Sequence, residues 1–242
     1  MKILQLNVWT GRIKGALLEF FQRNDFDVIC LQEAVWAGEN ERLQNFFVTV
    51  GQIKEASGLK NEMRSSNWKM NIFSDGDIMR QGNAILSREE IVNERTEVVY
   101  GEDALANSVE DFYNHAYTLQ IAKLRSGLNI VNHHGYWQPT PVGNETTTEV
   151  MKRVGEIVKE LDGPVVMCGD LNVIHEAPAM RELDFLRDLT HENGIKNTLS
   201  GLKFSGEVAC DHILVNDAVE VMDFKVLDDL VSDHKALAVE IK

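Results

Sequence analysis

The chain has 242 residues, of which 44% are hydrophobic and 26% are charged, and its formal net charge is −14 at pH 7. This length and composition indicate a globular protein with a sizeable core, and no apolar run approaches the roughly 20 residues that a membrane-spanning helix needs. The negative charge argues against a protein that holds long nucleic acid through a basic stripe, although residues distant in sequence can still form a local basic groove. An acidic enzyme acting on phosphates would rely on a bound divalent cation.

Three cysteines, Cys30, Cys168 and Cys210, lie in or beside apolar runs and lack the spacing of a metal site. We interpret them as reduced thiols of the core. The sequence opens on a strand-like pattern rather than on the basic and apolar segments of a signal peptide, so we expect a cytoplasmic protein without stable membrane insertion. No repeat, low-complexity tract or linker is visible, and we expect residues 1–242 to form one domain that acts as a monomer.

Strands and helices alternate in the first part of the chain. Apolar patterns predict, in order, strand 2–8, helix 13–24, strand 27–31, helix 39–60, and strands 67–73, 82–88 and 96–100. Asn7 comes near the end of the first strand, and Glu33 follows the second. The acidic segment that follows residue 100 has no clear pattern and is interpreted as a loop.

The second part of the chain is richer in strands. Its predicted elements are a hairpin of strands 116–124 and 128–134, helices 150–161 and 180–189, and strands 209–215, 219–227 and 235–241. The first of these helices is expected to begin with a threonine cap at 146–148 and to end at Gly163-Pro164. Residues 136–145 are a predicted loop at the mouth of the hairpin, where loops often carry specificity.

An apolar, strand-forming run from Val165 ends abruptly in Gly169-Asp170-Leu171-Asn172. Side chains alternate along an extended chain, so Asp170 and Asn172 are expected to point the same way while Leu171 faces the core. The structural alternative is a strand followed by an ordinary turn, because Asp and Asn favour turns for local hydrogen-bonding reasons. The first interpretation brings a carboxylate and a carboxamide to one spot, and it depends on what the other strand ends carry.

Polar residues of one chemical kind recur at five predicted strand ends. Each has a structural explanation as well, such as a solvated helix start for Glu33, a packed side chain for His134, or a turn for Asp233-His234. Carboxylates and carboxamides are the hard oxygen ligands that suit Mg²⁺, and an Asp–His pair suits proton handling. Around one cleft they would make a metal-assisted phosphoester hydrolase. The residues are Asn7, Glu33, His134, Asp170 with Asn172, and Asp211 with Asp233-His234.

The order of these motifs resembles that of the endonuclease/exonuclease/phosphatase superfamily of metal-dependent phosphohydrolases, which includes pancreatic-type deoxyribonucleases, apurinic endonucleases, deadenylases, neutral sphingomyelinases and inositol polyphosphate phosphatases. The combination of GDLN with a terminal SDH is specific, whereas either alone is weak. The resemblance implies an α/β fold, a four-layer α/β/β/α sandwich of two mixed β-sheets with helices on the outer faces. The motifs are LNVW at 6–9, LQE at 31–33, GNAILSR at 82–88, VNHHG at 131–135, GDLNV at 169–173, DHILV at 211–215 and SDHKAL at 232–237.

The resemblance also implies a metal site. Glu33 matches the principal metal-binding carboxylate of the family, with Asn7 beside it as a ligand or an outer contact and Asp233 near the metal. We expect Mg²⁺, with Mn²⁺ as a substitute, to bind at Glu33 with several retained waters. Trp9 stands where some nuclease members carry a metal-binding aspartate, which puts a second ion on that side in doubt.

Catalytic roles follow from the same resemblance. Asp170 matches the aspartate that orients or deprotonates the attacking water, and Asn172 matches its phosphate-contacting partner. His234 matches the histidine that stabilises the transition state, and we expect Asp211 to orient it through a carboxylate–imidazole hydrogen bond. As a strand-end carboxylate with little packing, Asp170 is expected to tolerate replacement by Ala within roughly 1 kcal/mol of stability, at a loss of roughly 100-fold or more in kcat.

The VNHHG motif contains two adjacent histidines, His133 and His134, and either could face the cleft. His134 matches a histidine that contacts the phosphate or the leaving group in the sphingomyelinase and deadenylase branches. His133 is the competitor, because strand alternation allows only one of the two to face the cleft.

The predicted function is a Mg²⁺-dependent phosphodiesterase or nuclease that acts on nucleic acid or a small phosphodiester. The alternatives are a phosphomonoesterase for phosphoinositides or small phosphates, and a binding domain that has lost the chemistry. Two segments are expected to set substrate choice, the loop 136–145 and the segment 101–115. Aromatic side chains in them would stack a base or hold an acyl group, or would merely anchor the loops. These are Phe112, Tyr113, Tyr136 and Trp137.

Overall fold

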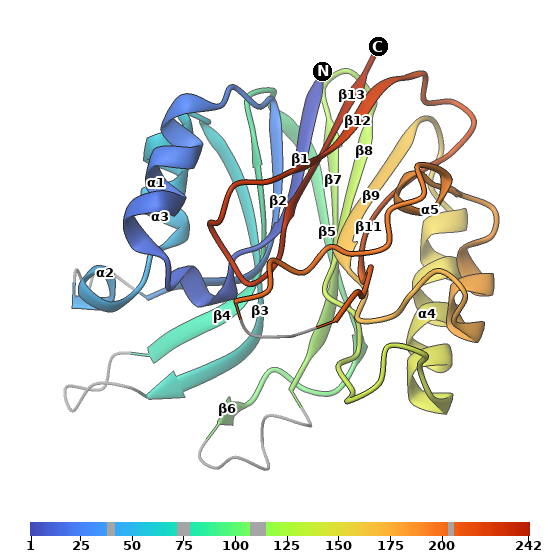
Figure 1. The fold of residues 1–242 in the computed structure, drawn as a ribbon, viewed down its shortest axis with the longest axis horizontal. Coiled ribbons are helices and arrows are strands. Elements are labelled where there is room, and N and C mark those ends of the chain that lie inside the picture. Colours follow the sequence, from blue (N-terminus) through green and yellow to red (C-terminus); the bar gives the residue numbers. More distant parts are fainter. Residues whose placement is uncertain (38–41, 72–77, 107–114, 203–205) are drawn as a thin grey trace.

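Two β-sheets pack face to face in the computed structural model, which describes residues 1–37, 42–71, 78–106, 115–202 and 206–242 (Figure 1). Helices α1 and α3 cover the outer face of one sheet and α4 covers the outer face of the other (Figure 1). The expected four-layer sandwich is therefore confirmed. Within the described residues, no helix is both long and apolar enough to span a membrane.

One sheet has seven strands in the order β12-β13-β1-β2-β4-β3-β6, and the other has six in the order β10-β11-β9-β8-β7-β5. Most neighbouring strands are antiparallel. In the first sheet β6 runs parallel to β3, and two central pairs are also parallel, β1 with β2 in the first sheet and β8 with β9 in the second. The carboxyl ends of these two central pairs lie at one edge of the sandwich. The strands of the first sheet are β1 (Lys2–Asn7), β2 (Val28–Trp36), β3 (Asn61–Asn71), β4 (Ile78–Ser87), β6 (Leu105–Ala106), β12 (Val221–Leu227) and β13 (Ala236–Ile241). Those of the second are β5 (Ile91–Tyr100), β7 (Tyr117–Leu124), β8 (Asn129–His133), β9 (Val165–Asp170), β10 (Arg187–Asp188) and β11 (Asp211–Val215).

The longer helices bury one apolar face each, as their sequence periodicity predicts. Helix α1 (Lys14–Arg23) buries Leu17, Phe20 and Phe21 against the first sheet. Helix α4 (Glu145–Lys159) buries a similar stripe against the second sheet. The amino end of α4 is capped by Asn144, whose side chain accepts a hydrogen bond from the Thr147 amide, so the predicted threonine cap is wrong by a few residues.

Two predicted helices are divided differently in the structure. The predicted helix 39–60 is two helices among the described residues, α2 (Arg42–Phe46) and α3 (Val50–Ser57). The break falls at Thr49, whose side chain caps α3. The predicted helix 180–189 is a 3₁₀ helix over Pro178–Leu183, followed by β10 and the short helix α5 (Leu189–Glu192). Asp188 caps α5, because its side chain accepts hydrogen bonds from the first amides of that helix. A new helix therefore begins after Asp188, where the sequence predicted one continuous helix.

A layer of polar side chains lies buried between the two sheets. The side-chain nitrogen of Gln32 donates to the Asn132 oxygen at 2.7 Å, and the Asn132 nitrogen donates to the Leu31 and Ala84 carbonyls and to Gln120. Gln32, Asn132 and Gln120 are all fully buried. Because buried polar groups are costly unless they are paired, these bonds fix the position of one sheet relative to the other.

Two glycines let β8 and β9 end close together. A Cβ atom at Gly135 would overlap the backbone oxygen of Leu171, and one at Gly169 would overlap the backbone oxygen of His133. The segments that follow the two strands therefore pass each other at backbone distance. This close passage requires glycine at both positions.

We predict that Asn132→Leu destabilises the protein by about 3 kcal/mol or more, because several buried partners lose their hydrogen bonds at once. Equilibrium unfolding in urea measures the change. Asn93→Leu, at an exposed position on β5, is the matched control and should change the free energy of unfolding by less than about 0.5 kcal/mol. A loss below about 1 kcal/mol for Asn132→Leu would contradict the structural role of this layer.

Candidate active site

The carboxyl ends of the central strands open into a cleft of about 160 Å³. Asp170 from β9 and Glu33 from β2 both line it. Asp233 and His234 reach it from the segment before β13, and Asn172 reaches it from the segment after β9. The structure thus brings together side chains from both sheets that are far apart in sequence.

Asp170 lies at the centre of the group and is only 1% exposed. Its Oδ2 accepts a hydrogen bond from the Asn7 side chain at 3.0 Å, and it lies 3.5 Å from His134 Nε2 and 3.7 Å from His234 Nε2. Burial alone would raise the pKa of this carboxyl group, but the charge of His234 and the bond and charge of His134 hold the pKa well below its usual value. Asp170 is therefore an ionised carboxylate between two imidazoles.

This burial corrects the expectation that Asp170 contributes little to packing. Asn7 and the backbone amide of Asn172 both donate to its carboxylate. Replacement by Ala would leave these donors without their acceptor and would leave a space beside them. We therefore expect the isosteric change Asp170→Asn to separate chemistry from folding better than Asp170→Ala.

Asn172 combines the two interpretations that the sequence left open. Its backbone amide donates to Asp170 Oδ1 at 3.0 Å, which is the bond of an Asx turn, and its backbone φ of 56° is in the left-handed region. Its side-chain nitrogen donates to the Gly135 carbonyl at 3.0 Å, so the side chain is held at the cleft wall. The turn is present, and it positions a site residue.

His134, not His133, reaches the site: its Nε2 lies 3.5 Å from Asp170 Oδ2, and its ring lines a cavity that adjoins the cleft. His133 is fully buried, its Nδ1 lies 3.0 Å from the Thr118 carbonyl, and burial lowers its pKa to about 4. For His134, burial lowers the pKa, but the hydrogen bond and charge of Asp170 outweigh burial, so that the net shift is upward. The alternative between the two neighbouring histidines is settled by the strand geometry.

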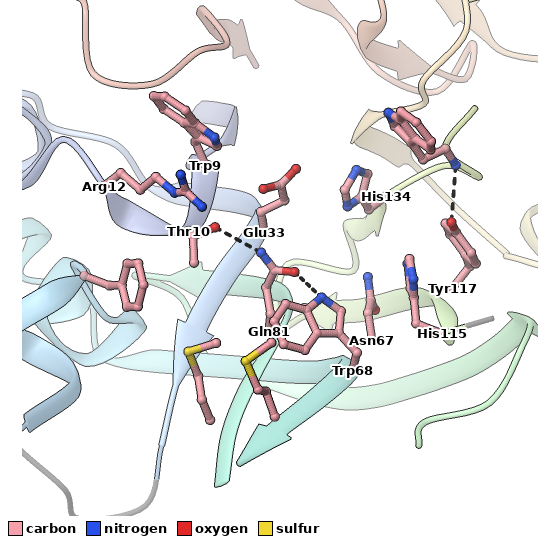
Figure 2. Close-up of a pocket in the computed structure, with 15 residues that line it drawn as sticks. Trp9, Thr10, Arg12, Glu33, Asn67, Trp68, Gln81, His115, Tyr117 and His134 are labelled. Carbon is pink, nitrogen blue, oxygen red and sulfur yellow. Dashed lines mark hydrogen bonds between the residues drawn. The ribbon is translucent and has the colours of Figure 1, made fainter. Parts of the chain in front are cut away.

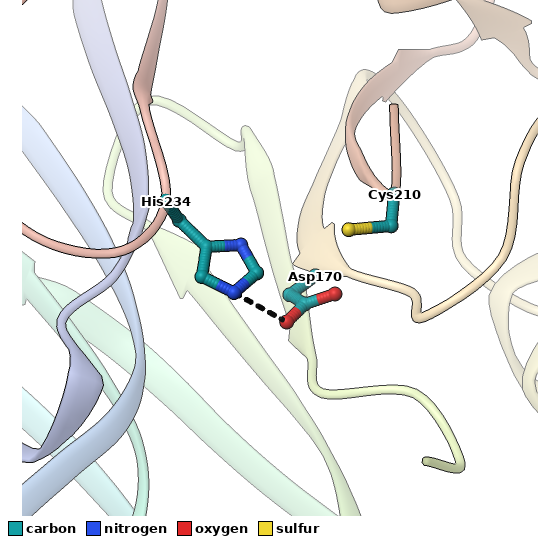
Figure 3. A group of neighbouring side chains, drawn as sticks. All are labelled: Asp170, Cys210 and His234. Atoms are coloured by element: carbon teal, nitrogen blue, oxygen red, sulfur yellow. Dashed lines mark ion pairs between the residues drawn. The ribbon is translucent and has the colours of Figure 1, made fainter. Parts of the chain in front are cut away.

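The predicted Asp211–His234 hydrogen bond is present, with 2.9 Å between His234 Nδ1 and Asp211 Oδ2. Burial lowers the pKa of His234, but the carboxylates of Asp211 and Asp170 raise it well above its usual value. Because Nδ1 donates to Asp211, the other ring nitrogen of the imidazolium, Nε2, presents its proton toward Asp170 (Figure 3). The side chains of Gln5 and Thr198 also donate to Asp211, at 2.9 and 2.6 Å.

The sequence predicted that Glu33 comes at the end of its strand. In the structure Glu33 instead lies within β2, at a bulge. Two residues, Gln32 and Glu33, stand opposite Asn83 of β4 between the Leu31 and Ala34 pairings. The φ of Glu33 is 51°, an uncommon conformation for a residue with a side chain. Bulges often turn a side chain out of a sheet at an active site, and this one directs the Glu33 carboxylate toward the cleft.

The oxygen donors at this end of the cleft fit a divalent cation. Glu33 and Asp233 bring carboxylates, which are hard ligands suited to Mg²⁺. Asn7 bridges Glu33 and Asp170 through its side-chain nitrogen, and its oxygen accepts a bond from the Trp9 amide at 3.0 Å. In the structure Asn7 therefore acts as a hydrogen-bonding bridge, and its role as a direct ligand stays a prediction.

A second group of candidate ligands is less suited to a cation. Atoms of Asp170, Cys210 and His234 lie within 4.8 Å of one another (Figure 3). Burial and the neighbouring carboxylates raise the pKa of the Cys210 thiol far above its usual value, so that this thiol is protonated. An imidazolium at His234 has no free lone pair either. We assign this group to proton handling instead of metal binding.

A second Asp–His pair, for which the sequence indicated no role, holds the loop that follows β9. His212 is fully buried, its Nδ1 lies 2.8 Å from Asp188 Oδ2, and its Nε2 lies 2.9 Å from the carbonyl of Val173. Both partners accept hydrogen bonds, so both ring nitrogens must donate and His212 is an imidazolium. The signal in the sequence was the DHILV motif itself, whose second residue points to the opposite face from Asp211.

We predict a pH-dependent stability difference between the wild type and His212→Gln. Burial lowers the pKa of His212, but Asp188 raises it above 6.5 overall. A raised folded-state pKa gives stability that is fully present below pH 6.5 and is lost as the pH rises through the folded-state pKa. The variant should be about 3 kcal/mol less stable at pH 5.5, the scale for breaking a buried pair, and the gap should shrink in alkali.

Urea unfolding between pH 5.5 and 9 measures this gap. Asp188→Asn removes the carboxylate that raises the pKa of His212, and it should abolish the same pH dependence. A stability gap that stays constant across the range would show that His212 is not charged in the folded protein.

The sandwich and its polar cleft define a hydrolase fold of the four-layer α/β class. The sequence matches the Endonuclease/Exonuclease/phosphatase family over residues 4–234, so the chain belongs to that family. Its members are typically phosphoesterases that depend on a divalent metal. The resemblance seen in the motifs is thereby confirmed. No curated protein matches the chain.

Solved structures share the fold at low sequence identity. A mannosyl-6-phosphatase from Bacteroides thetaiotaomicron is 18% identical with a TM-score of 0.72, covering 100% of this chain and 99% of that one. The catalytic domain of human Nocturnin with bound sulfate is 15% identical with a TM-score of 0.68, covering 100% and 93%. An endonuclease/exonuclease/phosphatase from Beutenbergia cavernae is 16% identical with a TM-score of 0.69, covering 100% and 71%.

Proposed function

We propose that this protein is a Mg²⁺-dependent hydrolase of small phosphodiesters. The observation that carries the proposal is the position of the Asp170 carboxylate, which lies between the imidazoles of His134 and His234 in a cleft that Glu33 also lines. The site offers oxygen ligands to a cation and N–H donors to phosphoryl oxygens. A phosphoester bound there would meet compensating charge from both.

Glu33 and Asp233 would hold Mg²⁺, with Asn7 beside them and Mn²⁺ as a substitute ion. The cation would neutralise charge on the phosphoryl oxygens and acidify water. Asn7 keeps Glu33 and Asp170 in a fixed arrangement, because its single side-chain nitrogen donates to both carboxylates, at 3.1 and 3.0 Å.

Asp170 would orient the attacking water. Its low pKa keeps the carboxylate ionised across the physiological range, so it accepts a hydrogen bond from the water and directs the oxygen toward phosphorus. A carboxylate of low pKa is a weak base, and we therefore assign its main contribution to alignment.

His234 and His134 would meet the charge that develops on phosphorus. The imidazolium of His234 has its Nδ1 fixed by Asp211, which leaves the Nε2 proton directed into the cleft. His134 enters the same region from the end of β8, with its pKa raised by Asp170. Donors fixed in place before the reaction stabilise the transition state without a cost of reorganisation.

A diester suits the charge of this site better than a monoester does. A diester carries one negative charge, whereas a monoester carries about two near neutral pH and needs more cationic partners. The net charge of −14 also disfavours long nucleic acid. Phosphomonoester hydrolysis remains the second candidate, because the mannosyl-6-phosphatase of similar fold is named for that activity.

We predict that Asp170→Asn lowers kcat by roughly 100-fold or more, the scale for a positioned catalytic group, with a much smaller change in KM. The amide keeps the shape of the side chain and one oxygen acceptor. Initial rates with saturating Mg²⁺ on a panel of small diesters and monoesters measure the change, and thermal unfolding checks the fold. A folded variant that keeps more than about a tenth of the wild-type kcat would remove Asp170 from this role.

Metal binding is tested separately from activity. Mg²⁺ or Mn²⁺ should raise the melting temperature of the wild type in a saturable way, because an ion that binds only the folded state stabilises it. Glu33→Gln should lose most of this shift and most activity. Glu62→Gln, at a partly exposed position on β3 outside the cleft, is the control and should keep both. Equal shifts for wild type and Glu33→Gln would place the ion elsewhere.

A further inference from the structure

A larger cavity of about 540 Å³ adjoins the catalytic cleft (Figure 2). Glu33 and Trp137 line both spaces, and His134 lines the larger one as well. A ligand whose phosphate lies in the cleft beside Glu33 and His234 would therefore extend its organic part into this cavity. The volume is within the range of about 300–1,000 Å³ typical of small-molecule sites.

The walls of this cavity are dominated by aromatic rings and thioethers. Three of the four tryptophans of the chain contribute to them. Flat, polarisable walls of this kind favour a flat, uncharged ligand group that stacks on them. The lining includes Trp9, Phe47, Trp68, Met70, Met79, Tyr117 and Trp137.

The polar groups of the cavity floor are already paired with one another. The indole nitrogen of Trp68 donates to the Gln81 oxygen, and the Gln81 nitrogen donates to Thr10 Oγ1 at 3.2 Å (Figure 2). These bonds fix the indole in position and leave the floor largely apolar toward a ligand. A sugar, which needs partners for many hydroxyl groups, would find few on this floor.

Asn67 is the exception, because it offers donors to the cavity. It is 3% exposed, and its oxygen accepts a bond from Thr118 Oγ1 at 2.7 Å. The same threonine hydroxyl accepts a hydrogen bond from Asn83 and lies 2.8 Å from Ser65 Oγ, so Thr118 is held in place by three neighbours. The Asn67 side-chain nitrogen points toward the cavity (Figure 2).

A second bulge produces this orientation. Asn67 is the extra residue of β3, between the pairings of Ser66 with Gly82 and of Trp68 with Gln81. A Cβ atom at Gly82 would overlap the Ser65 backbone oxygen, so the bulge requires glycine there. Strand β2 is the other neighbour of β4, and its bulge at Glu33 lies opposite Asn83, the residue next to Gly82. Two bulges thus direct a carboxylate and an amide donor into one space.

The charges around the cavity exclude strongly ionic ligand groups. Along the described lining, Arg12 is the one guanidinium or ammonium group, and it lies over the Trp9 ring at 5.2 Å. A polyphosphate would need more cations than this. A quaternary ammonium would suit the aromatic walls, but it would face the N–H donors of Asn67 and the charge of Arg12, and the Glu33 carboxylate on the same lining is the proposed ligand of the metal ion.

We propose that this cavity binds the base of a nucleoside phosphoester, stacked on the tryptophan walls and hydrogen-bonded through a ring acceptor to Asn67. The proposal rests on the proposed phosphoester hydrolysis and names its substrate class. The structure brings Trp137 of the loop 136–145 to the junction of cavity and cleft. Tyr136 instead packs against Tyr100 and Tyr117, while Phe112 and Tyr113 lie outside the described residues.

The first test measures binding without metal and without turnover. Uridine 5′-monophosphate, glucose 6-phosphate, phosphocholine and inorganic phosphate are titrated while tryptophan fluorescence is recorded with excitation at the red edge. We expect saturable quenching by the nucleotide alone. Quenching that is equal for all four, absent for all four, or stronger for the sugar phosphate or phosphocholine would overturn the proposal.

The second test uses variants and hydrolysis. With Mg²⁺, phosphorus NMR follows the methyl phosphodiesters of uridine, glucose and choline. We expect kcat/KM to favour the uridine ester by about 10- to 100-fold, the range that stacking one base provides. Asn67→Asp should lose most of this preference, because it exchanges N–H donors for an acceptor. Asn93→Asp, which makes the same change on the exposed surface of β5, should keep it.

Trp137→Ala decides the outcome if Asn67→Asp does not fold, because Trp137 is 46% exposed and its loss should spare the core. It should weaken both the quenching and the preference for uridine, and an unchanged preference would overturn the proposal. Hydrolysis of all three esters at equal rates would refute the base pocket and leave the proposed function intact. Selective quenching without hydrolysis of any ester would refute the proposed function and keep the base pocket.

Discussion

The burial of the Asp170 and Asp211 carboxylates between the two sheets is the constraint on which the site depends. An unpaired buried carboxylate would take up a proton, so each of these must be surrounded by donors and positive charge. His234 serves both, with Nδ1 on Asp211 and Nε2 toward Asp170. The result is an alternation of carboxylate and imidazole groups in which each side chain is held in place by its neighbours.

Glycine at position 82 imposes a second constraint, this time on the backbone. Strand β4 pairs with β2 on one side and with β3 on the other, and both partners bulge at the same level. Without a side chain on Gly82, β3 can approach closely enough for Asn67 to leave the regular ladder. The proposed metal ligand Glu33 and the proposed base contact Asn67 therefore come from two bulges that lie on either side of β4.

Regular patterns in the sequence predicted most of the strands and helices and the polar residues at the strand ends, because period-2 and period-3.6 spacing report on burial directly. The sandwich, and the grouping of those polar residues at one site, were implied by the resemblance of the motifs to a known family. The bulges at Glu33 and Asn67 were beyond that reasoning, since an inserted residue has no periodic signature and depends on a neighbouring strand. The starts of two helices were also predicted wrongly. Helices α4 and α3 begin directly after Asn144 and Thr49, because the side chains of these residues reach the free amides of the first helical turn. The pairing of His212 with Asp188 was not predicted, because Asp188 lies in a segment that was predicted as helix.

Adjacent residues of β11 explain why the loop after β9 has so little freedom. Asp211 faces the space between the sheets and binds His234 and Gln5, whereas His212 faces the other side and binds Asp188 and the Val173 carbonyl. Asp170 pairs across the ladder with Asp211, so the loop that follows β9 is fixed at both ends of its short span. Asn172 adopts a left-handed backbone conformation there, which suits an asparagine, and its bonds to Asp170 and to the Gly135 carbonyl hold it in place. In the proposed function the two Asp–His pairs have distinct tasks: one would present a proton to the substrate, and the other holds the backbone beside Asp170.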